Sequence, residues 1–154
     1  MGELGERGIL FMETEIIEKE LSYRIMKAAF EVYNQLGPGY GESIYTEAMA
    51  LELKVQGVSI ERQKHIVVKY KGQVIGEHYL DALAEGRVIL EYKAVAELAQ
   101  VHKLQALSYL KTTGLPLAIV INFGAARLQS SRVVHTKQKL SGPKSSPESP
   151  RNQA

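Results

Sequence analysis

The chain has 154 residues, a formal net charge of +2 and no cysteine. Its length suits one domain, and its content of 45% hydrophobic and 23% charged residues is ordinary for a globular protein. No run approaches about eighteen consecutive apolar residues, so no membrane span is predicted, and the lack of cysteine excludes disulfides and thiolate metal sites.

Composition divides the chain into a domain and two flanking segments. Residues 1–13 are expected to be a leader without the pattern of a secretory signal, and Met12 is an alternative start to Met1. Residues 14–136 are predicted to form the domain. Residues 137–154, rich in serine, proline and basic side chains, are predicted to be a disordered tail. A cytoplasmic location is the default expectation.

Two helices are predicted at the start of the domain. Apolar residues recur at three- and four-residue spacing from Ile16 to Leu36, and Gly37-Pro38-Gly39 ends this amphipathic helix. A second helix is predicted from Glu42 to Val55, and Glu42 in its first turn suits the helix dipole. Its predicted core stripe consists of Ile44, Ala48, Leu51 and Val55.

Strands dominate the next part of the chain. They are predicted at 58–62, 65–70, 73–84 and 88–95, with Lys71-Gly72 and Glu85-Gly86-Arg87 as tight turns. A helix follows over 101–113, with Leu104, Leu107 and Leu110 as its core stripe, and then strands over 117–122 and 132–135. Three linked strands followed by a helix crossing to another strand predict an α/β fold with a mixed sheet flanked by helices.

The hairpin over residues 79–95 carries a charged face. If its turn is centred on Gly86, residue numbers that sum to about 172 lie opposite each other, which places Asp81 opposite Glu91. Because side chains alternate with period two, Lys93 shares their face. Two opposed carboxylates repel each other unless a cation or shared proton intervenes, and Mg²⁺ would suit them. The alternative is a structural Glu91–Lys93 ion pair with Asp81 solvated.

Other polar side chains could reach the same cleft. Glu42 precedes the sheet, and His102, Gln105 and Tyr109 follow it on one side of the predicted helix. Taken singly, each also fits the polar side of a helix. The four histidines, His65, His78, His102 and His135, lack zinc-like spacing, and no nucleophile elbow is present. A glycosidase carboxylate pair would leave Lys93 without a role.

These residues resemble known motifs. Asp81 with Glu91-Tyr92-Lys93 resembles the Asp…Glu-x-Lys core of the PD-(D/E)xK nuclease superfamily, and Gln105 to Tyr109 matches the Gln-x-x-x-Tyr motif of its RecB-like branch. Gly39-Tyr-Gly-Glu42-Ser-Ile-Tyr45 is similar to the signature of the bacterial GxxExxY proteins. Leu36–Gly39, Tyr70–Gly72, Leu90–Val95, His102 and Ile121–Gly124 also fit that family. The resemblance covers about residues 14–135 and implies a restriction-endonuclease-like core.

The resemblance also implies roles for individual residues. Asp81, Glu91 and the backbone carbonyl of Tyr92 would hold Mg²⁺, with Mn²⁺ as a substitute, and Glu42 would complete the site or bind a second ion. Lys93 would position or deprotonate the attacking water and stabilise the transition state. Gln105 and Tyr109 would orient the lysine or the substrate phosphate. One departure is Tyr79, which stands where relatives often carry an arginine.

The resulting prediction is a Mg²⁺-dependent nuclease acting on DNA. The alternative is a binding or accessory protein that keeps the fold without cutting, as a homo-oligomer or with a partner subunit. Charge favours the alternative: residues 127–154 carry six basic residues and one acid, or +5, so residues 1–126 carry −3. The complete set of Glu42, Asp81, Glu91 and Lys93 favours the nuclease.

Overall fold

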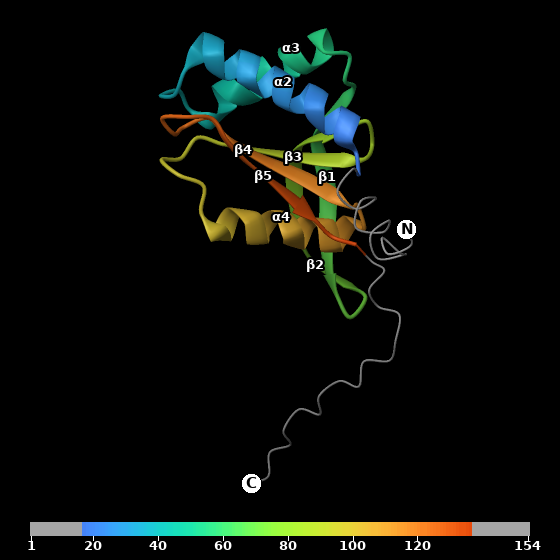
Figure 1. Cartoon of the computed structure of the whole chain (residues 1–154). Coiled ribbons are helices and arrows are strands. Elements are labelled where there is room, and N and C mark those ends of the chain that lie inside the picture. The colour runs from blue at the N-terminus through green and yellow to red at the C-terminus, as the bar shows by residue number, and fades with distance from the viewer. Residues whose placement is uncertain (1–16, 137–154) are drawn as a thin grey trace, which may run out of the picture.

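The computed structural model describes residues 17–136. A five-stranded sheet separates two helices on one face from one helix on the other (Figure 1). The helices are α2 (Lys19–Leu36), α3 (Glu42–Val55) and α4 (Gln100–Thr113). The strands are β1 (Ile60–Tyr70), β2 (Gln73–Ala84), β3 (Val88–Lys93), β4 (Leu117–Asn122) and β5 (Gln129–Val134). None of these helices combines the length and apolarity needed to cross a membrane.

The sheet is mixed and has the strand order β1-β2-β3-β4-β5. Neighbouring strands are antiparallel except β3 and β4, which are parallel. A parallel pair needs a long crossover, and α4 provides it. The observed order of elements and the mixed sheet with helices on both faces confirm the predicted α/β fold.

Each face of the sheet buries its own apolar cluster. The cluster beneath α2 and α3 includes Tyr45, Tyr92 and Phe123, whereas Ile89 and Tyr109 belong to the cluster beneath α4. Because β3 and β4 are covered on both faces, their sequences are almost continuously apolar. The charged residues near the end of β3 therefore stand in an apolar layer.

The predicted core stripe of α3 is wrong at three of its four positions, and only Ala48 packs against the core. Ile44, Leu51 and Val55 are exposed, and the buried residues are Tyr45, Met49 and Leu53. Apolar residues occupy more than one side of this helix, so their spacing supports two stripes. The stripe that includes Tyr45 is buried because the aromatic ring stacks on Phe123, at 4.8 Å between centroids.

The predicted stripe of α4 is confirmed at Leu110 but wrong at Leu104, for the same reason. Leu104 is exposed, whereas Ala106, Tyr109 and Leu110 are buried against the sheet. The side carrying Tyr109, which resembles the wetter side of the helix in sequence, thus lies against the sheet, where the tyrosine ring stacks on His78 of β2. This rotation brings Gln105 towards the charged end of β3.

Several predicted boundaries also shift. β1 is one strand with an irregularity at Gln63 (φ 51°), β3 ends at Lys93 instead of Val95, and β5 begins at Gln129. Helix α2 begins at Lys19, and the predicted start at Ile16 lies outside the described residues. The predicted leader, 1–13, and tail, 137–154, also lie outside them.

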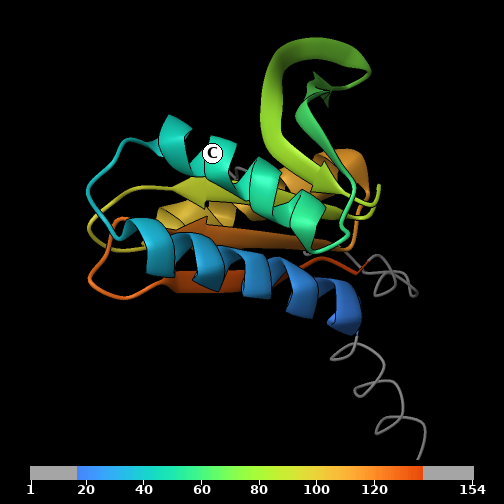
Figure 2. The same cartoon turned by 90° about the horizontal axis from the view of Figure 1, so that it is seen from above.

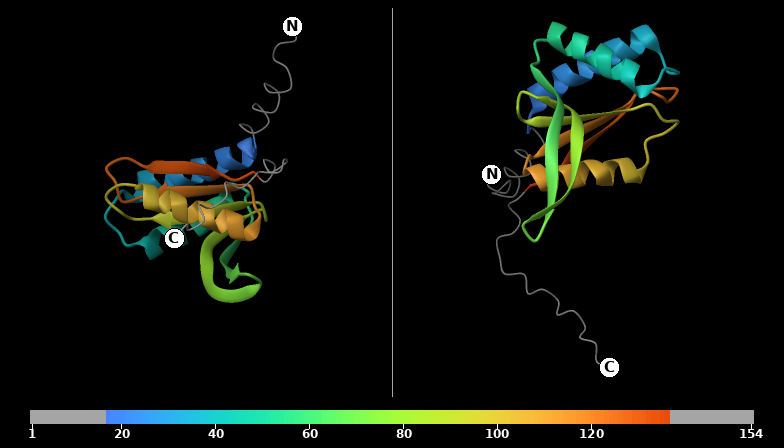
Figure 3. Two further views of the ribbon diagram at one scale, coloured as in Figure 1. Left: turned by 90° about the horizontal axis from the view of Figure 1, so that it is seen from below. Right: turned by 180° about the vertical axis from the view of Figure 1, so that it is seen from behind.

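The hairpin of β1 and β2 continues beyond the sheet as a curved arm (Figures 2 and 3). β2 pairs with β1 along its whole length but with β3 only from Ala82 to Ala84. We define the arm as residues 62–80, whose strands have only each other as partners. Its base adjoins Asp81.

Candidate functional site

The site lies where β2 leaves β3. Ala82 pairs with Leu90 and Leu83 with Ile89, so the predicted hairpin register is confirmed. The next residue of β2 towards the arm is Asp81, for which no backbone pair with β3 forms. From this point the hydrogen bonds between the two strands join backbone N–H groups to side-chain carboxylates.

Asp81 and Glu91 exchange hydrogen bonds with each other's strand. The backbone N–H of Tyr92 donates to Asp81 Oδ2 at 2.7 Å, and that of Asp81 donates to Glu91 Oε1 at 3.3 Å. The second oxygen of each carboxylate accepts no hydrogen bond from residues 17–136. Glu91 is only 5% exposed, so two carboxyl groups meet here in a largely apolar setting.

This setting shifts the pKa values of three carboxyl groups upward. Burial and the charge of Asp81 raise the pKa of Glu91 to about 8. Burial also raises the pKa of Asp81, against the Tyr92 N–H bond and the charge of Lys93. The pKa of Glu42 is raised by burial and by Asp81. The three groups therefore share one electrostatic environment that a cation would stabilise.

Lys93 contacts the helix instead of the carboxylates. Its Nζ donates to Gln105 Oε1 at 3.4 Å. Among the ion pairs of the described chain, none joins Lys93 to Glu91, so the structural ion pair considered from the sequence does not form. The ammonium group stays available at the edge of the site.

Tyr109 reaches the site through His78. Their rings stack with centroids 4.2 Å apart, and Tyr109 Oη lies 3.2 Å from His78 Nδ1. His78 Nε2 is buried without a hydrogen-bond partner in residues 17–136 and lies 3.9 Å from Glu91 Oε1. Burial lowers the pKa of His78, and burial together with Glu91 and Asp81 raises that of Tyr109 to about 12.

Regular alternation along β2 does not predict a place for His78 in the site. Alternation would place His78 and Asp81 on opposite faces. However, Leu80 and Leu83 both belong to the cluster beneath α4, while Ala82 faces the other helices, so the alternation breaks beside Asp81. No local sequence signal marks this break.

Glu42 is placed by the residues around it in the Gly39–Tyr45 motif. Tyr45 Oη donates to the carbonyl of Gly37 at 2.6 Å and accepts the N–H of Tyr40 at 3.2 Å. Gly39 has φ 120°, a conformation that favours glycine. The tyrosine and glycine thus shape the loop that presents Glu42 at the start of α3.

The Ile121–Gly124 segment holds the chain that follows Lys93. Asn122 is fully buried; its Nδ2 donates to the carbonyl of Val95 and its Oδ1 accepts the N–H of Val95, both at 2.9 Å. The N–H of Phe123 donates to the carbonyl of Lys93 at 2.8 Å. The segment therefore positions the end of β3 without contributing a side chain to the carboxylates.

The residues predicted for the site do not all come from one side of the sheet, because Glu42 begins α3, which covers the face opposite α4. Asp81, Glu91, Lys93, Gln105 and Tyr109 lie on the α4 side of the sheet. Of the predicted metal-site residues, Tyr92 contributes its backbone beside Asp81, while its ring lies on the opposite face.

The carboxylates fit a divalent cation bound together with substrate. Residues 17–136 contain no group of three histidine, aspartate or glutamate side chains placed to hold a metal alone. Mg²⁺ usually takes one or two protein carboxylates and completes its shell with water and phosphate oxygens. Asp81 and Glu91 supply two such groups, and burial raises the pKa of both, a penalty on their charged forms that a bound cation would offset.

The protonation of Glu91 makes stability depend on pH. Its folded pKa of about 8 exceeds the ordinary 4.5, so between these values the folded protein holds a proton that the unfolded chain releases. Raising the pH from 5 to 8 therefore penalises the folded state. The difference in free energy of unfolding between Glu91→Gln and wild type is therefore expected to shift in favour of the variant by at least about 1 kcal/mol from pH 5 to pH 8, measured without metal.

Urea unfolding at pH 5, 6, 7 and 8 in chelator measures this difference. Glu97→Gln, which removes an exposed carboxyl group, is the matched control and should follow wild type. Parallel pH profiles for Glu91→Gln and wild type would show that Glu91 is not held protonated.

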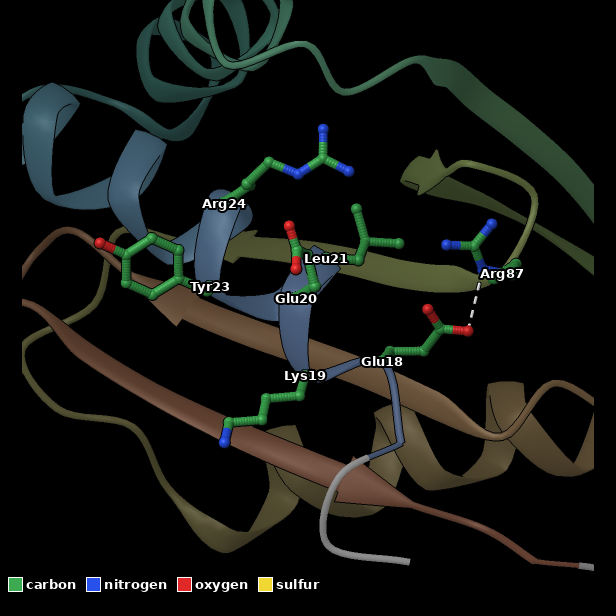
Figure 4. A pocket seen from close by; sticks show the side chains of 7 residues that line it. All are labelled: Glu18, Lys19, Glu20, Leu21, Tyr23, Arg24 and Arg87. Carbon is green, nitrogen blue, oxygen red and sulfur yellow. Dashed lines mark hydrogen bonds and ion pairs between the residues drawn. The ribbon is translucent and has the colours of Figure 1, made fainter. Parts of the chain in front are cut away.

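A separate hollow lies at the start of α2 (Figure 4). Glu18, Lys19, Glu20, Leu21, Tyr23, Arg24 and Arg87 line it. Arg87 Nε donates to Glu18 Oε2 at 2.9 Å, which ties the β2–β3 turn to the helix start. This hollow shares no residue with the carboxylate site.

Comparison with known proteins bears on the fold and the superfamily of the chain. The profile of the PD-(D/E)XK nuclease superfamily matches residues 19–133. A solved structure, "Crystal structure of SSO0001", is similar with a TM-score of 0.51 and 15% identity over 82% of this chain and 63% of that one. This chain therefore spans 63% of that protein's length, and the likeness shows the fold. No curated protein sequence matches the chain.

The sheet and helices described above are consistent with a restriction-endonuclease-like core. Nucleases of the superfamily usually use divalent metal ions and act on nucleic acid. Since the profile match covers almost all of the described domain, the chain belongs to the PD-(D/E)XK nuclease superfamily.

Proposed function

We propose that the protein is a Mg²⁺-dependent nuclease that hydrolyses phosphodiester bonds in DNA. The observation that carries this proposal is the meeting of Asp81 and Glu91 in an apolar layer, with the ammonium group of Lys93 held beside them by Gln105. Superfamily membership supports nuclease chemistry. Superfamily membership does not specify the ion or the kind of nucleic acid, so Mg²⁺ and DNA are parts of the proposal.

Asp81, Glu91 and the backbone carbonyl of Tyr92 would hold the ion, and Glu42 would complete the site or hold a second one. When bound, the ion supplies charge stabilisation to phosphate oxygens. The raised pKa values of the three carboxyl groups support this arrangement, because they indicate a site that favours added positive charge.

Lys93 would position the attacking water and stabilise the negative charge that develops on the phosphate. Gln105 would hold the lysine side chain through the 3.4 Å contact. Tyr109 would act one step further away, by fixing His78, whose Nε2 lies near Glu91. The tyrosine is thus a positioning residue.

We also place the chain among the bacterial GxxExxY proteins of the RecB-like branch. The contacts of Tyr45, the φ angle of Gly39 and the position of Glu42 give each motif residue a physical role. A cytoplasmic location, which suits a cysteine-free protein, is part of this proposal.

Cleavage assays with metal added or removed test the function. Pure protein is incubated with end-labelled single- or double-stranded DNA in Mg²⁺, Mn²⁺ or chelator. Cleavage is expected with either ion and is expected to fall to background in chelator, because the carboxylates alone cannot stabilise the phosphate charge. Asp81→Asn should also fall to background. Cleavage that persists in chelator would contradict the proposal.

Titration calorimetry with Mg²⁺ or Mn²⁺ in the presence of uncleavable DNA separates binding from chemistry. Wild type is expected to bind the metal ion with a measurable heat, and Asp81→Asn is expected to show none. No binding would contradict the metal site. Metal binding without any cleavage would instead favour a non-cleaving accessory protein, acting as an oligomer or with a partner.

A further inference from the structure

The arm of residues 62–80 concentrates positive charge. Four basic residues (Arg62, Lys64, Lys69 and Lys71) and one acid (Glu77) give it +3. The other residues from 17 to 136 include ten basic and eleven acidic ones, or −1. The body of the protein is therefore nearly neutral, and the excess positive charge projects from it.

Ion pairs neutralise the base of the arm but not its tip. Arg62 pairs with Glu47, Lys64 with Glu61, and His65 with Glu77. No ion pair joins Lys69 or Lys71 to any residue between 17 and 136. At the tip, Lys71 Nζ lies 5.4 Å from the centre of the exposed Tyr70 ring.

A third lysine, Lys111 of α4, lies with Lys69 at a hollow between the arm and α4. The hollow is lined by Val67 and Lys69 from β1 and by Lys111 and Thr112 from the last turns of α4. Lys111 likewise has no ion pair within the described chain. Two ammonium groups at one hollow repel each other, and an anion between them would reverse that repulsion.

The arm leads directly to the carboxylate site. β2 runs without interruption from Gln73 at the tip to Asp81 at the base. At about 3.4 Å per residue, the eight steps of this stretch follow a curved path of about 27 Å, which is on the scale of the ~34 Å of one turn of B-form DNA. Figures 2 and 3 show the arm curving away from the sheet and passing beside α4.

We propose that the arm, together with the end of α4, binds double-stranded DNA. Lys69, Lys71 and Lys111 contact backbone phosphates along one turn while a phosphodiester bond of the same duplex lies at Asp81 and Glu91. The proposal rests on the proposed nuclease function and adds its substrate form and binding surface.

Three features favour a duplex over a single strand. A two-stranded β ribbon fits the major groove of B-form DNA. The exposed apolar residues of the arm, Val74, Ile75 and Tyr79, can contact sugars and base methyl groups there. Surfaces for single strands instead rely on rows of aromatic stacking partners within a groove, whereas the exposed tyrosines of the arm are Tyr70 at its tip and Tyr79 near its base, nine residues apart in sequence.

Fluorescence anisotropy with a labelled duplex of about 24 base pairs tests the surface. The full chain is measured in chelator, so that binding is independent of cleavage, over a series of NaCl concentrations. A triple variant (Lys69→Gln, Lys71→Gln, Lys111→Gln) is compared with a control triple variant on α2 and α3 (Lys19→Gln, Lys27→Gln, Lys54→Gln), which removes the same charge from exposed positions.

The arm variant is expected to lower the slope of log affinity against log salt by about 2 to 3, because each phosphate contact contributes about 0.9. Its affinity near 0.1 M salt should fall at least tenfold, while the control variant binds like wild type. Equal weakening in both variants would overturn the proposal. So would tighter binding to the matching single strand, or a dimer in light scattering that the arm variant loses.

The experiments distinguish an error in the proposed binding surface from an error in the proposed nuclease function. If wild type cuts DNA and the arm variant binds the duplex unchanged, the binding surface is wrong and the nuclease function stands. If the arm variant loses duplex binding as expected but wild type never cuts with Mg²⁺ or Mn²⁺, the surface stands and the nuclease function is wrong.

Discussion

Lys93→Ala is expected to lower the rate of Mg²⁺-dependent DNA cleavage by at least about 100-fold, the typical cost of removing one group that stabilises transition-state charge. Lys93 ends β3 beside both carboxylates, and its Nζ is held by Gln105. It forms no ion pair within residues 17–136, and its charge acts on Asp81 and Glu91 only from beyond ion-pair distance. Stability should therefore change by less than about 1 kcal/mol.

Single-turnover cleavage at saturating Mg²⁺ measures this effect. Duplex binding in chelator should change by less than about threefold, which separates chemistry from affinity. Lys27→Ala is the matched control, because it removes the same charge from the exposed side of α2 and should cleave like wild type. Undiminished metal-dependent cleavage by Lys93→Ala would remove this residue from the site.

Gly124→Ala is expected to destabilise the protein by about 3 kcal/mol or more, at the upper end of overpacking effects. A Cβ at this position would lie 2.5 Å from the carbonyl carbon of Ala94 and 2.6 Å from the nitrogen and oxygen of Val95. All three are backbone atoms, and the amide of Asn122 already holds the two of Val95 by hydrogen bonds. They cannot move without releasing the chain that follows Lys93.

Urea unfolding at pH 7 gives the free energy of unfolding for this variant. Gly76→Ala is the control, because its new Cβ meets nothing within 4 Å, and it should be within about 0.5 kcal/mol of wild type. Any folded Gly124→Ala protein should also lose cleavage, since displacement of residues 94 and 95 moves Lys93. A Gly124→Ala protein as stable and as active as wild type would show that this contact does not constrain the site.

The two residues differ in how far the sequence reveals their roles. The alternation and turn of the hairpin predict that Lys93 shares a face with Asp81 and Glu91. Gly124 stands in the sequence only as part of a motif, which gives no sign of its physical role. The close approach of Gly124 to Ala94 joins segments about thirty residues apart, which no local pattern can reveal.

Local rules were sufficient for the order of the elements and for the register of the central hairpin. The turn at Glu85 and Gly86, both with positive φ, is encoded in adjacent residues. Once that turn is placed, the pairing of Ala84 with Val88, Leu83 with Ile89 and Ala82 with Leu90 follows, and Asp81 and Glu91 are the next residues along the two strands. The sequence therefore determined the fold class and the centre of the candidate site by itself.

The tertiary structure alone decided which helix covers that site and which side chains complete it. In α3 and α4, apolar residues on several sides allowed more than one core stripe, and packing of Tyr45 and Tyr109 selected one. His78 joined the site because β2 breaks its alternation at Asp81, where it leaves the sheet to form the arm. Helix rotation and strand departure depend on contacts between distant segments, so periodicity within one segment could not predict them.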